Sequence, residues 1–331
     1  MIRFGLLGCG RIGVVHSRAI KNTPNAQVVA VSDAFPAAAE NLAGEIGAEV
    51  RDVDDVIEAD DIDAIVIGTP TTTHYDLIHK IAAAGKAIFC EKPVDLSSDR
   101  IRDCIKAVEA TGVPFLTAFN RRFDPNFAEV KRRIDAGEIG QVELLTILSR
   151  DPSAPPIDYI KNSGGLYRDM MIHDLDMARF LLGEDPVSIF AVGSSLVDPA
   201  IGEAGDVDTA AVTLTTASGA ICQISNSRRA SYGYDQRLEV HGAKGMLRAE
   251  NILENSVQLA NETGFSNAPA QHFFLERYEQ AYAREMQSFI DALENGTAQS
   301  PSIYDGLKAQ LLADAAAESF ATGKPVTIQY D

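Results

Sequence analysis

The part of the chain before Asn120 alternates short apolar runs with segments whose apolar residues recur at helical spacing. The apolar runs are rich in β-branched residues, as expected for strands of a parallel sheet that is buried on both faces. These predicted strands are Ile2–Leu7, Val28–Ser32, Ala64–Ile67, Ala87–Cys90 and Pro114–Ala118. The predicted helices between them are Pro36–Ile46, Tyr75–Ala84 and Ser98–Ala110. Strands that alternate with helices predict a doubly wound α/β domain.

After Asn120 the pattern changes to longer strands in which apolar and polar residues alternate. The later predicted strands are Val142–Leu148, Val187–Val197, Thr209–Thr216, Ala220–Asn226, Gln236–His241 and Ser256–Ala260. The predicted helices are Pro125–Ala136, Leu166–Leu182, Leu275–Glu294 and Asp305–Ala321. Residues 216–219 supply a turn of the kind that joins antiparallel strands. We therefore expect two domains, residues 1–120 and residues 121–331, the second of α+β type.

The composition narrows the class of protein. The formal net charge of −18 repels the phosphates of nucleic acid and of anionic lipids, so we expect neither as a partner. No run of apolar residues approaches the length of a membrane span, and we expect a soluble, cytoplasmic protein. The four cysteines are scattered, none forms a CxxC pair, and no metal site is expected. We interpret the basic pair Arg228-Arg229 as a solvated or interface feature.

A glycine motif follows the first predicted strand and opens a helix. It reads Gly8-Cys9-Gly10-Arg11-Ile12-Gly13, and its spacing suits a tight turn that approaches a pyrophosphate at a helix N-terminus. The second strand ends at Asp33, whose carboxylate can accept hydrogen bonds from an adenosine ribose and would repel a 2′-phosphate. No basic residue follows at positions 34–36, so we expect NAD rather than NADP. An ordinary glycine turn and an ordinary turn aspartate are the alternatives.

Two further segments are harder to explain by fold alone: Glu91-Lys92-Pro93 after a strand, and residues 164–174, Gly-Gly-Leu-Tyr-Arg-Asp-Met-Met-Ile-His-Asp. Together with the glycine loop and residues 68–74, Gly-Thr-Pro-Thr-Thr-Thr-His, they make the chain resemble the Gfo/Idh/MocA oxidoreductases over nearly its whole length. Residues 149–186 resemble most the bacterial inositol 2-dehydrogenases within that family.

The resemblance implies a Rossmann domain followed by a domain with an open, mostly antiparallel sheet, through which such proteins usually assemble into tetramers. It implies NAD-dependent oxidation of a secondary hydroxyl of a cyclic polyol, myo-inositol being the expected substrate, and a place in inositol catabolism. It also implies that the catalytic residues are Lys92, Asp169 and His173.

The expected cofactor contacts are Gly8, Gly10, Arg11, Ile12, Gly13, Asp33, Thr69, His74, Glu91 and Lys92. The expected substrate contacts are Lys92, Arg121, Asp151, Asp169, His173 and Tyr234. For His74 and for Tyr234, packing is the alternative role. The chain departs from some inositol dehydrogenases at Ser149 and Asp151, where those proteins carry a histidine and an asparagine.

Alcohol oxidation needs a base for the hydroxyl proton. Asp169 and His173 are four residues apart, which would place both on one face of the predicted helix, so that the carboxylate could orient the imidazole. Lys92 follows a parallel strand at the end where ligands bind, and it could polarise the oxygen or accept the proton itself. The spacing leaves open which of Lys92 and His173 is the base.

Two alternatives to this function remain at the level of the sequence. The same chemistry could act on another sugar or sugar derivative, because spacing does not reveal where a pocket places its hydrogen bonds. A regulator that senses the cofactor without turnover, as some members of this family do, is the alternative from another class. The presence of Lys92, Asp169 and His173 together favours the enzyme.

Overall fold

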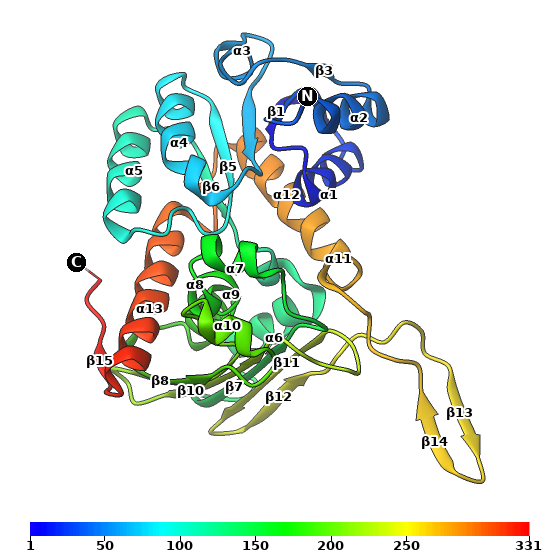
Figure 1. Ribbon diagram of the computed structural model, residues 1–331, viewed down its shortest axis with the longest axis vertical. Coiled ribbons are helices and arrows are strands. Elements are labelled where there is room, and N and C mark those ends of the chain that lie inside the picture. Colours follow the sequence, from blue (N-terminus) through cyan, green and yellow to red (C-terminus); the bar gives the residue numbers. More distant parts are fainter. Residues whose placement is uncertain (331) are drawn as a thin grey trace. The chain divides into compact units, whose positions relative to one another are not determined.

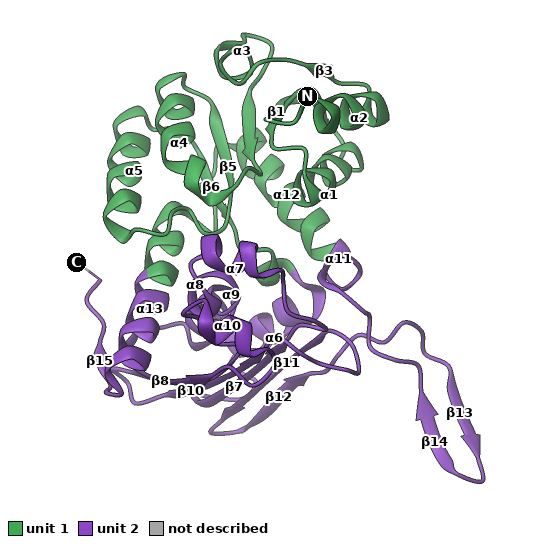
Figure 2. Cartoon of the chain, in the orientation of Figure 1, with its two compact units in different colours: residues 1–123, 280–310 green, residues 124–279, 311–331 purple. Residues whose placement is uncertain are grey.

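The computed structural model describes residues 1–330 and divides into two compact units (Figures 1 and 2). Unit 1 comprises residues 1–123 and 280–310, and unit 2 comprises residues 124–279 together with the chain from residue 311 onward. The expected boundary at residue 120 thus differs little from the observed one. The return of residues 280–310 to unit 1 was not expected.

Unit 1 is built on a six-stranded sheet with the order β3-β2-β1-β4-β5-β6, in which every pair is parallel. This order is that of a Rossmann domain, and the predicted fold of this part is confirmed. The strands are β1 (Ile2–Leu7), β2 (Ala26–Ser32), β3 (Glu49–Val50), β4 (Ala64–Ile67), β5 (Ala87–Glu91) and β6 (Phe115–Ala118). The helices are α1 (Arg11–Lys21), α2 (Pro36–Ile46), α3 (Val53–Glu58), η1 (Thr71–Thr73), α4 (His74–Ala83), α5 (Ser98–Thr111) and η2 (Asn120–Phe123).

Helix α12 (Glu279–Asn295) joins unit 1 through an apolar face. Its Phe289 is fully buried, and its ring lies 5.5 Å from the ring of Phe89 on β5 and 6.2 Å from that of Phe4 on β1, measured between centroids. Met286 and Ile290 belong to the same core cluster. Helical periodicity reveals such a face but not the surface against which it packs, which is why the sequence assigned this helix to the second domain.

Unit 2 contains a seven-stranded sheet with the order β12-β11-β7-β10-β9-β8-β15. Only the β7–β10 pair is parallel, so the expected open, mostly antiparallel sheet is confirmed. The strands are β7 (Val142–Arg150), β8 (Pro186–Ser194), β9 (Thr209–Thr216), β10 (Ile221–Ser227), β11 (Asp235–Gly242), β12 (Gly245–Ala249) and β15 (Val326–Thr327). The helices are α6 (Pro125–Asp135), α7 (Ile157–Ser163), α8 (Leu166–Asp169), α9 (Ile172–Leu182), α10 (Pro199–Glu203) and α11 (Phe274–Arg277), while α13 (Ile303–Thr322) contributes residues to both units.

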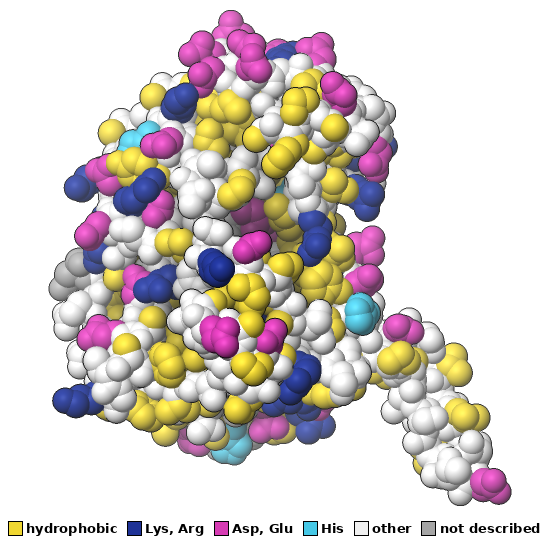
Figure 3. All heavy atoms as spheres, viewed as in Figure 1, with side chains coloured by type: hydrophobic (Ala, Val, Ile, Leu, Met, Phe, Trp, Pro, Cys, Tyr) yellow, Lys and Arg dark blue, Asp and Glu magenta, His cyan; other side chains and the backbone are white. Residues whose placement is uncertain are grey.

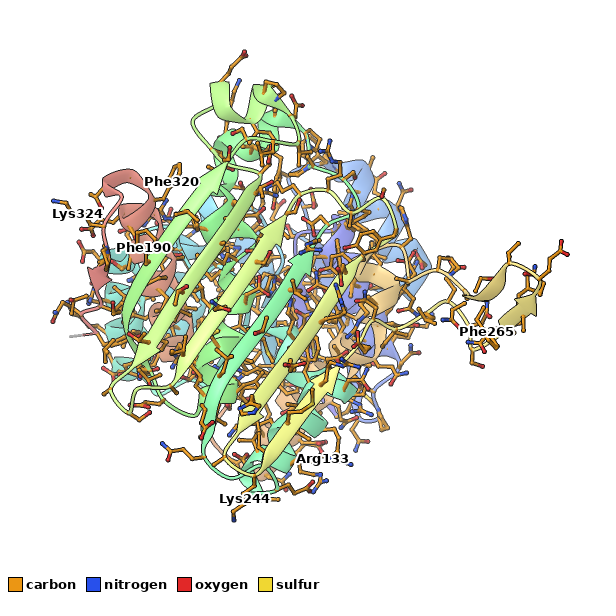
Figure 4. All side chains as sticks on the ribbon, turned by 90° about the horizontal axis from the view of Figure 1, so that it is seen from below. Arg133, Phe190, Lys244, Phe265, Phe320 and Lys324 are labelled. Carbon is orange, nitrogen blue, oxygen red and sulfur yellow. The ribbon has the colours of Figure 1, made fainter. Side chains whose placement is uncertain are left out.

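The two faces of this sheet differ in exposure because side chains alternate along each strand. One face carries buried residues such as Leu145 and Ile147 on β7. The other face, which Figure 4 views directly and on which Phe190 is labelled, remains partly exposed although it is apolar in several places. Its exposed apolar side chains include Leu144, Phe190, Val192, Ile221 and Met246.

Two predicted elements of unit 2 were wrong in their extent. The helix expected over Leu166–Leu182 is interrupted, because Met170 and Met171 form a turn between α8 and α9 in which the Met171 amide reaches back to the Leu166 carbonyl. The strand expected at Ser256–Ala260 lies instead in a separate hairpin, β13 (Gln258–Asn261) with β14 (Gly264–Asn267), that projects from the rest of unit 2 (Figure 1).

Candidate active site

The glycine loop between β1 and α1 packs too closely for side chains at two positions. A Cβ on Gly8, whose φ is +96°, would lie 2.6 Å from the backbone of Gly68 after β4. A Cβ on Gly13 would lie 2.0 Å from the Gly8 carbonyl oxygen. Around Gly10, by contrast, a Cβ would meet no atom of the described residues within 4 Å, so the space over the loop stays open.

The N-terminus of α1 suits an anion. Gly10 is its N-cap and gives the first-turn amides no side-chain hydrogen bond, and no acidic residue lies in that first turn. Arg11 and Ile12 begin the helix, whose dipole places partial positive charge at this end. Amides that point into open space at a helix N-terminus are the usual cradle of a pyrophosphate, so the residues present fit a dinucleotide.

Asp33 lies directly after β2, beside the glycine loop. Its Oδ2 accepts a hydrogen bond from the Cys9 amide at 2.6 Å, and its Oδ1 accepts one from the Phe35 amide at 2.8 Å. These two bonds fix the carboxylate next to the loop, where the ribose of a bound adenosine would be recognised. The residues that follow, Ala34 and the exposed Phe35, offer no charge to a 2′-phosphate.

His74 connects the segment after β4 to the turn after β5. Its Nε2 lies 2.9 Å from the Thr69 carbonyl oxygen and its Nδ1 lies 3.0 Å from that of Pro93. Burial lowers the pKa of His74, whereas the two carbonyl contacts act in the opposite direction. These contacts support the packing role that the sequence left open, whereas a contact of His74 with the cofactor stays a prediction.

Glu91 and Lys92 are positioned by a buried polar group that the sequence did not reveal. His16 on α1 is fully buried, and its Nε2 lies 2.6 Å from Glu91 Oε1. The other oxygen of Glu91 accepts a hydrogen bond from the Lys92 amide at 3.1 Å. Glu285 on α12 is also fully buried, and burial, aided by the charge of Glu91, raises its pKa well above the usual value. In the sequence, the one available signal of this buried group was His16 itself, three residues after the last glycine of the motif.

Arg121 is the remaining predicted residue of unit 1. It lies in η2 directly after β6 and is 5% exposed. Its neighbour Arg122 forms an ion pair with Asp305 at 2.9 Å. The predicted residues of unit 1 therefore all lie at or after the carboxyl ends of parallel strands, the edge at which ligands bind in such sheets.

In unit 2, Asp169 ends the short helix α8 and is held at both carboxylate oxygens. Its Oδ1 accepts a hydrogen bond from the Tyr159 hydroxyl at 2.8 Å, and its Oδ2 lies 3.3 Å from Arg228 Nη2. Arg228 is 1% exposed, so the interpretation of Arg228-Arg229 as a solvated or interface pair is wrong for the first of them. The exposed Arg229 fits that interpretation.

His173 lies in the first turn of α9, beyond the break that separates it from Asp169. The expected placement of both residues on one face of a single helix is therefore wrong, and their action as a pair stays a proposal. The Asp151 amide donates to the Ser227 carbonyl at 2.9 Å, which brings the start of the loop after β7 next to Arg228.

Ser149 and Tyr234 are occupied in packing. The Ser149 hydroxyl is fully buried and accepts a hydrogen bond from Gln236 Nε2 at 3.0 Å. The ring of Tyr234 packs against Tyr278 and Phe273, with centroids 6.0 and 6.3 Å away. Tyr234 is thus placed by an aromatic cluster, and its contact with substrate stays a prediction.

Across residues 1–330, no group of three or more His, Cys, Asp or Glu side chains is arranged to hold a metal ion. The four cysteines are buried, unlinked thiols. No helix within those residues has the length and apolarity to cross a membrane. On the face shown in Figure 3, basic side chains are interspersed with acidic ones.

Comparison with known proteins finds relatives that match the chain over nearly its whole length. Residues 2–119 match the model of an oxidoreductase family with an NAD-binding Rossmann fold, and residues 127–248 match that of the GFO/IDH/MocA C-terminal domain. An inositol 2-dehydrogenase of Rhizobium meliloti is 57% identical over 99% of both chains. A myo-inositol 2-dehydrogenase of Thermotoga maritima is 42% identical over 99% of both. The crystal structure of a scyllo-inositol dehydrogenase of Lactobacillus casei with NAD(H) and scyllo-inositol is 32% identical, covers 99% of both chains and superposes with a TM-score of 0.92.

Proposed function

Because the chain belongs to the Gfo/Idh/MocA family and is an NAD-dependent dehydrogenase, we propose that it oxidises myo-inositol at one secondary hydroxyl to 2-keto-myo-inositol. The observation that carries the choice of substrate is the 57% identity to an inositol 2-dehydrogenase over 99% of both chains. The 42% identity to a myo-inositol 2-dehydrogenase supports the same stereoisomer.

In this proposal each unit has its own task. Gly8, Gly10, Gly13 and Asp33 of unit 1 bind the dinucleotide, with Arg11, Ile12, Thr69 and Glu91 as further contacts. NAD supplies the hydride acceptor when it is bound. Unit 2 supplies Asp151, Asp169, His173 and Tyr234 for the polyol and carries the sheet through which copies associate.

Oxidation of the alcohol also requires that the hydroxyl proton leave the substrate oxygen. Lys92 Nζ and the imidazole of His173 are the two candidate acceptors, and Asp169 would stabilise the protonated imidazole. Glu91 and His16 hold the backbone of Lys92 through the Glu91 carboxylate. Arg121 is the proposed donor to a hydroxyl that does not react.

A panel of polyols tests this function. The purified enzyme would be mixed with NAD or NADP and with myo-inositol, scyllo-inositol, other inositols, or common aldoses and sugar acids, and NADH or NADPH formation followed by absorbance. We expect the highest kcat/KM with NAD and myo-inositol. A higher kcat/KM on a sugar would assign the same chemistry to another substrate. Failure of every polyol to produce NADH would favour a regulator that only senses the cofactor.

We further propose a homotetramer in the cytoplasm. The exposed apolar residues on the open face of the seven-stranded sheet, Phe190 and Val192 among them, are a surface that association would cover (Figure 4). The four reduced, buried thiols suit a reducing compartment. Light scattering at micromolar concentration should give four times the chain mass of 35.6 kDa, whereas the mass of a single chain would contradict the proposal.

A further inference from the structure

Arg228 is a buried cation in unit 2 that the proposed reaction has not used. It follows β10 directly, and its side chain is 2% exposed. The Arg228 amide donates to the Asp208 carbonyl at 2.8 Å, which fixes the backbone. A guanidinium stays charged when it is buried, so it needs a compensating anion. The anion is Asp169, whose Oδ2 lies 3.3 Å from Nη2 and 3.5 Å from Nη1.

Asp169 needs this partner because its own helix cannot hold it. Helix α8 spans only Leu166–Asp169, and the chain turns at Met170 and Met171 before α9 begins. A single turn of helix gives little restraint to a residue at its end. The carboxylate is instead fixed by groups from two other segments, the Tyr159 hydroxyl on α7 and the Arg228 guanidinium after β10.

The distances indicate what Arg228 contributes. Charged hydrogen bonds between nitrogen and oxygen usually measure about 2.7–2.9 Å. The two contacts to Asp169 are longer than that, so Arg228 supplies compensation of charge more than a tight, directional bond. A lysine at this position would therefore retain part of the effect, whereas a neutral side chain would not.

We propose that Arg228 is a positioning residue that holds the Asp169 carboxylate in place for the reaction, with Tyr159 as its second support. This inference rests on the proposed function, in which Asp169 acts on the imidazole of His173 or on the substrate. It assigns to Arg228 a role through Asp169 alone and no direct contact with substrate.

The neighbouring arginine provides a matched control. Arg229 is exposed, and its guanidinium lies 3.4 and 3.5 Å from the carbonyl oxygens of Val197 and Leu196 rather than near a carboxylate. Arg228→Gln should lower kcat about tenfold or more, and Arg228→Lys should recover part of that loss. Arg229→Gln should stay within about twofold of the wild type, and NADH affinity measured by fluorescence should be unchanged in all three.

A role through Asp169 also predicts how the substitutions combine. The kcat of Arg228→Gln/Asp169→Asn should equal that of Asp169→Asn alone, because nothing is left for the arginine to position. Tyr159→Phe, at a half-exposed residue that should not prevent folding, should lower kcat in the same direction. The proposal is overturned if Arg228→Gln and Arg229→Gln have equal kcat, or if the losses in the double variant multiply.

A measurement without substrate separates failure of this inference from failure of the proposed function. Urea unfolding of the wild type, Arg228→Gln, Asp169→Asn and the double variant forms a cycle that reports the coupling of the two side chains. We expect the sum of the two single losses of stability to exceed the loss in the double variant. Additive losses of stability would refute the pairing of Arg228 with Asp169, and coupled losses would support it. Either result holds even if the enzyme turns over no polyol.

Discussion

The preference for NAD should depend on the charge of Asp33, and elementary electrostatics gives its approximate size. A 2′-phosphate carries a charge of about −1.5 to −2. Two unit charges about 4 Å apart interact by about 1 kcal/mol in water, so the repulsion between this phosphate and Asp33 amounts to about 2 kcal/mol. NADP also loses the hydrogen bond that the ribose hydroxyl of NAD makes to the carboxylate, about 1 kcal/mol more. The sum of about 3 kcal/mol corresponds to a preference of about 100-fold.

Asp33→Asn separates the charge from the hydrogen bonds. The amide oxygen can still accept from the Cys9 amide, which now lies 2.6 Å from the carboxylate, so the glycine loop keeps one of its supports. We expect kcat/KM with NADP to rise about 30-fold, the equivalent of about 2 kcal/mol, and kcat/KM with NAD to fall by less than that. Replacing Asp33 by a small residue, together with Ala34→Arg, should go further and shift the preference toward NADP.

The assay is the initial rate with each cofactor at saturating polyol. Glu40→Gln is the matched control, because Glu40 lies on the exposed side of α2 and its loss removes the same charge from elsewhere in unit 1. It should leave the ratio of the two kcat/KM values unchanged. Less than a tenfold preference in the wild type, or an equal effect of both neutral variants, would refute the reasoning.

Three further predictions concern catalysis and stability. Lys92→Ala, Asp169→Asn and His173→Ala should each lower kcat about 10²-fold with NAD affinity within a few-fold, and near-normal turnover of the Lys92 or His173 variant would exclude it as the base. If Asp169 only orients His173, their double variant should have the kcat of His173→Ala. Because the pKa of Glu285 is raised well above 4.5 in the fold, the unfolded chain loses this proton first as pH rises. Above pH 4.5 the wild type should therefore lose stability relative to Glu285→Gln, by up to about 1.4 kcal/mol per pH unit. Urea midpoints of the two proteins that differ equally at every pH would contradict this. Phe289→Ala should cost about 3–5 kcal/mol in urea unfolding because it empties the contact of α12 with the rest of unit 1, and a loss below 1 kcal/mol would contradict that packing.

The sequence predicted the Rossmann sheet well because the relevant signals are local. Strands buried on both faces, such as Ala64–Ile67, are continuous apolar runs, and each is followed by a helix of the expected period. The glycine motif is also local in part, since Gly13 packs against the Gly8 carbonyl of the same motif, although Gly8 also packs against the more distant Gly68. Asp33 was found because its distance along the chain from the motif is set by one strand–helix–strand unit.

The sequence failed where the deciding contact is distant in the chain. The apolar face of α12 packs beside Phe4 and Phe89, which lie far earlier in the chain, and no local pattern shows this choice. The break after Asp169 depends on an amide of Met171 that bonds the Leu166 carbonyl, in a stretch whose residue types all suit a helix. His16 was hidden because a single polar residue on a helix is usually exposed.

Arg228 is a different case, because its burial could have been predicted. Along β10 the even-numbered side chains Cys222, Ile224 and Asn226 are buried, and the odd-numbered ones face the open side of the sheet. The same alternation continues past the end of the strand, so that Arg228 is buried and Arg229 is exposed. Along the buried side of the strand, the residues thus change from apolar to polar toward its C-terminal end.

The last two inward side chains, Asn226 and Arg228, each contact an acidic residue from the helical segments over the sheet. Asn226 Nδ2 donates to Asp174 at 2.8 Å, and the Arg228 guanidinium lies beside Asp169. A buried side of a strand normally stays apolar to its end, since each buried polar group costs stability unless it is paired. Polar residues at consecutive inward positions therefore indicate partners on the facing segment, and here that segment carries Asp169 and His173. The period-two pattern, followed two residues beyond the predicted strand, would have predicted from the sequence that Arg228 is buried and needs an acidic partner.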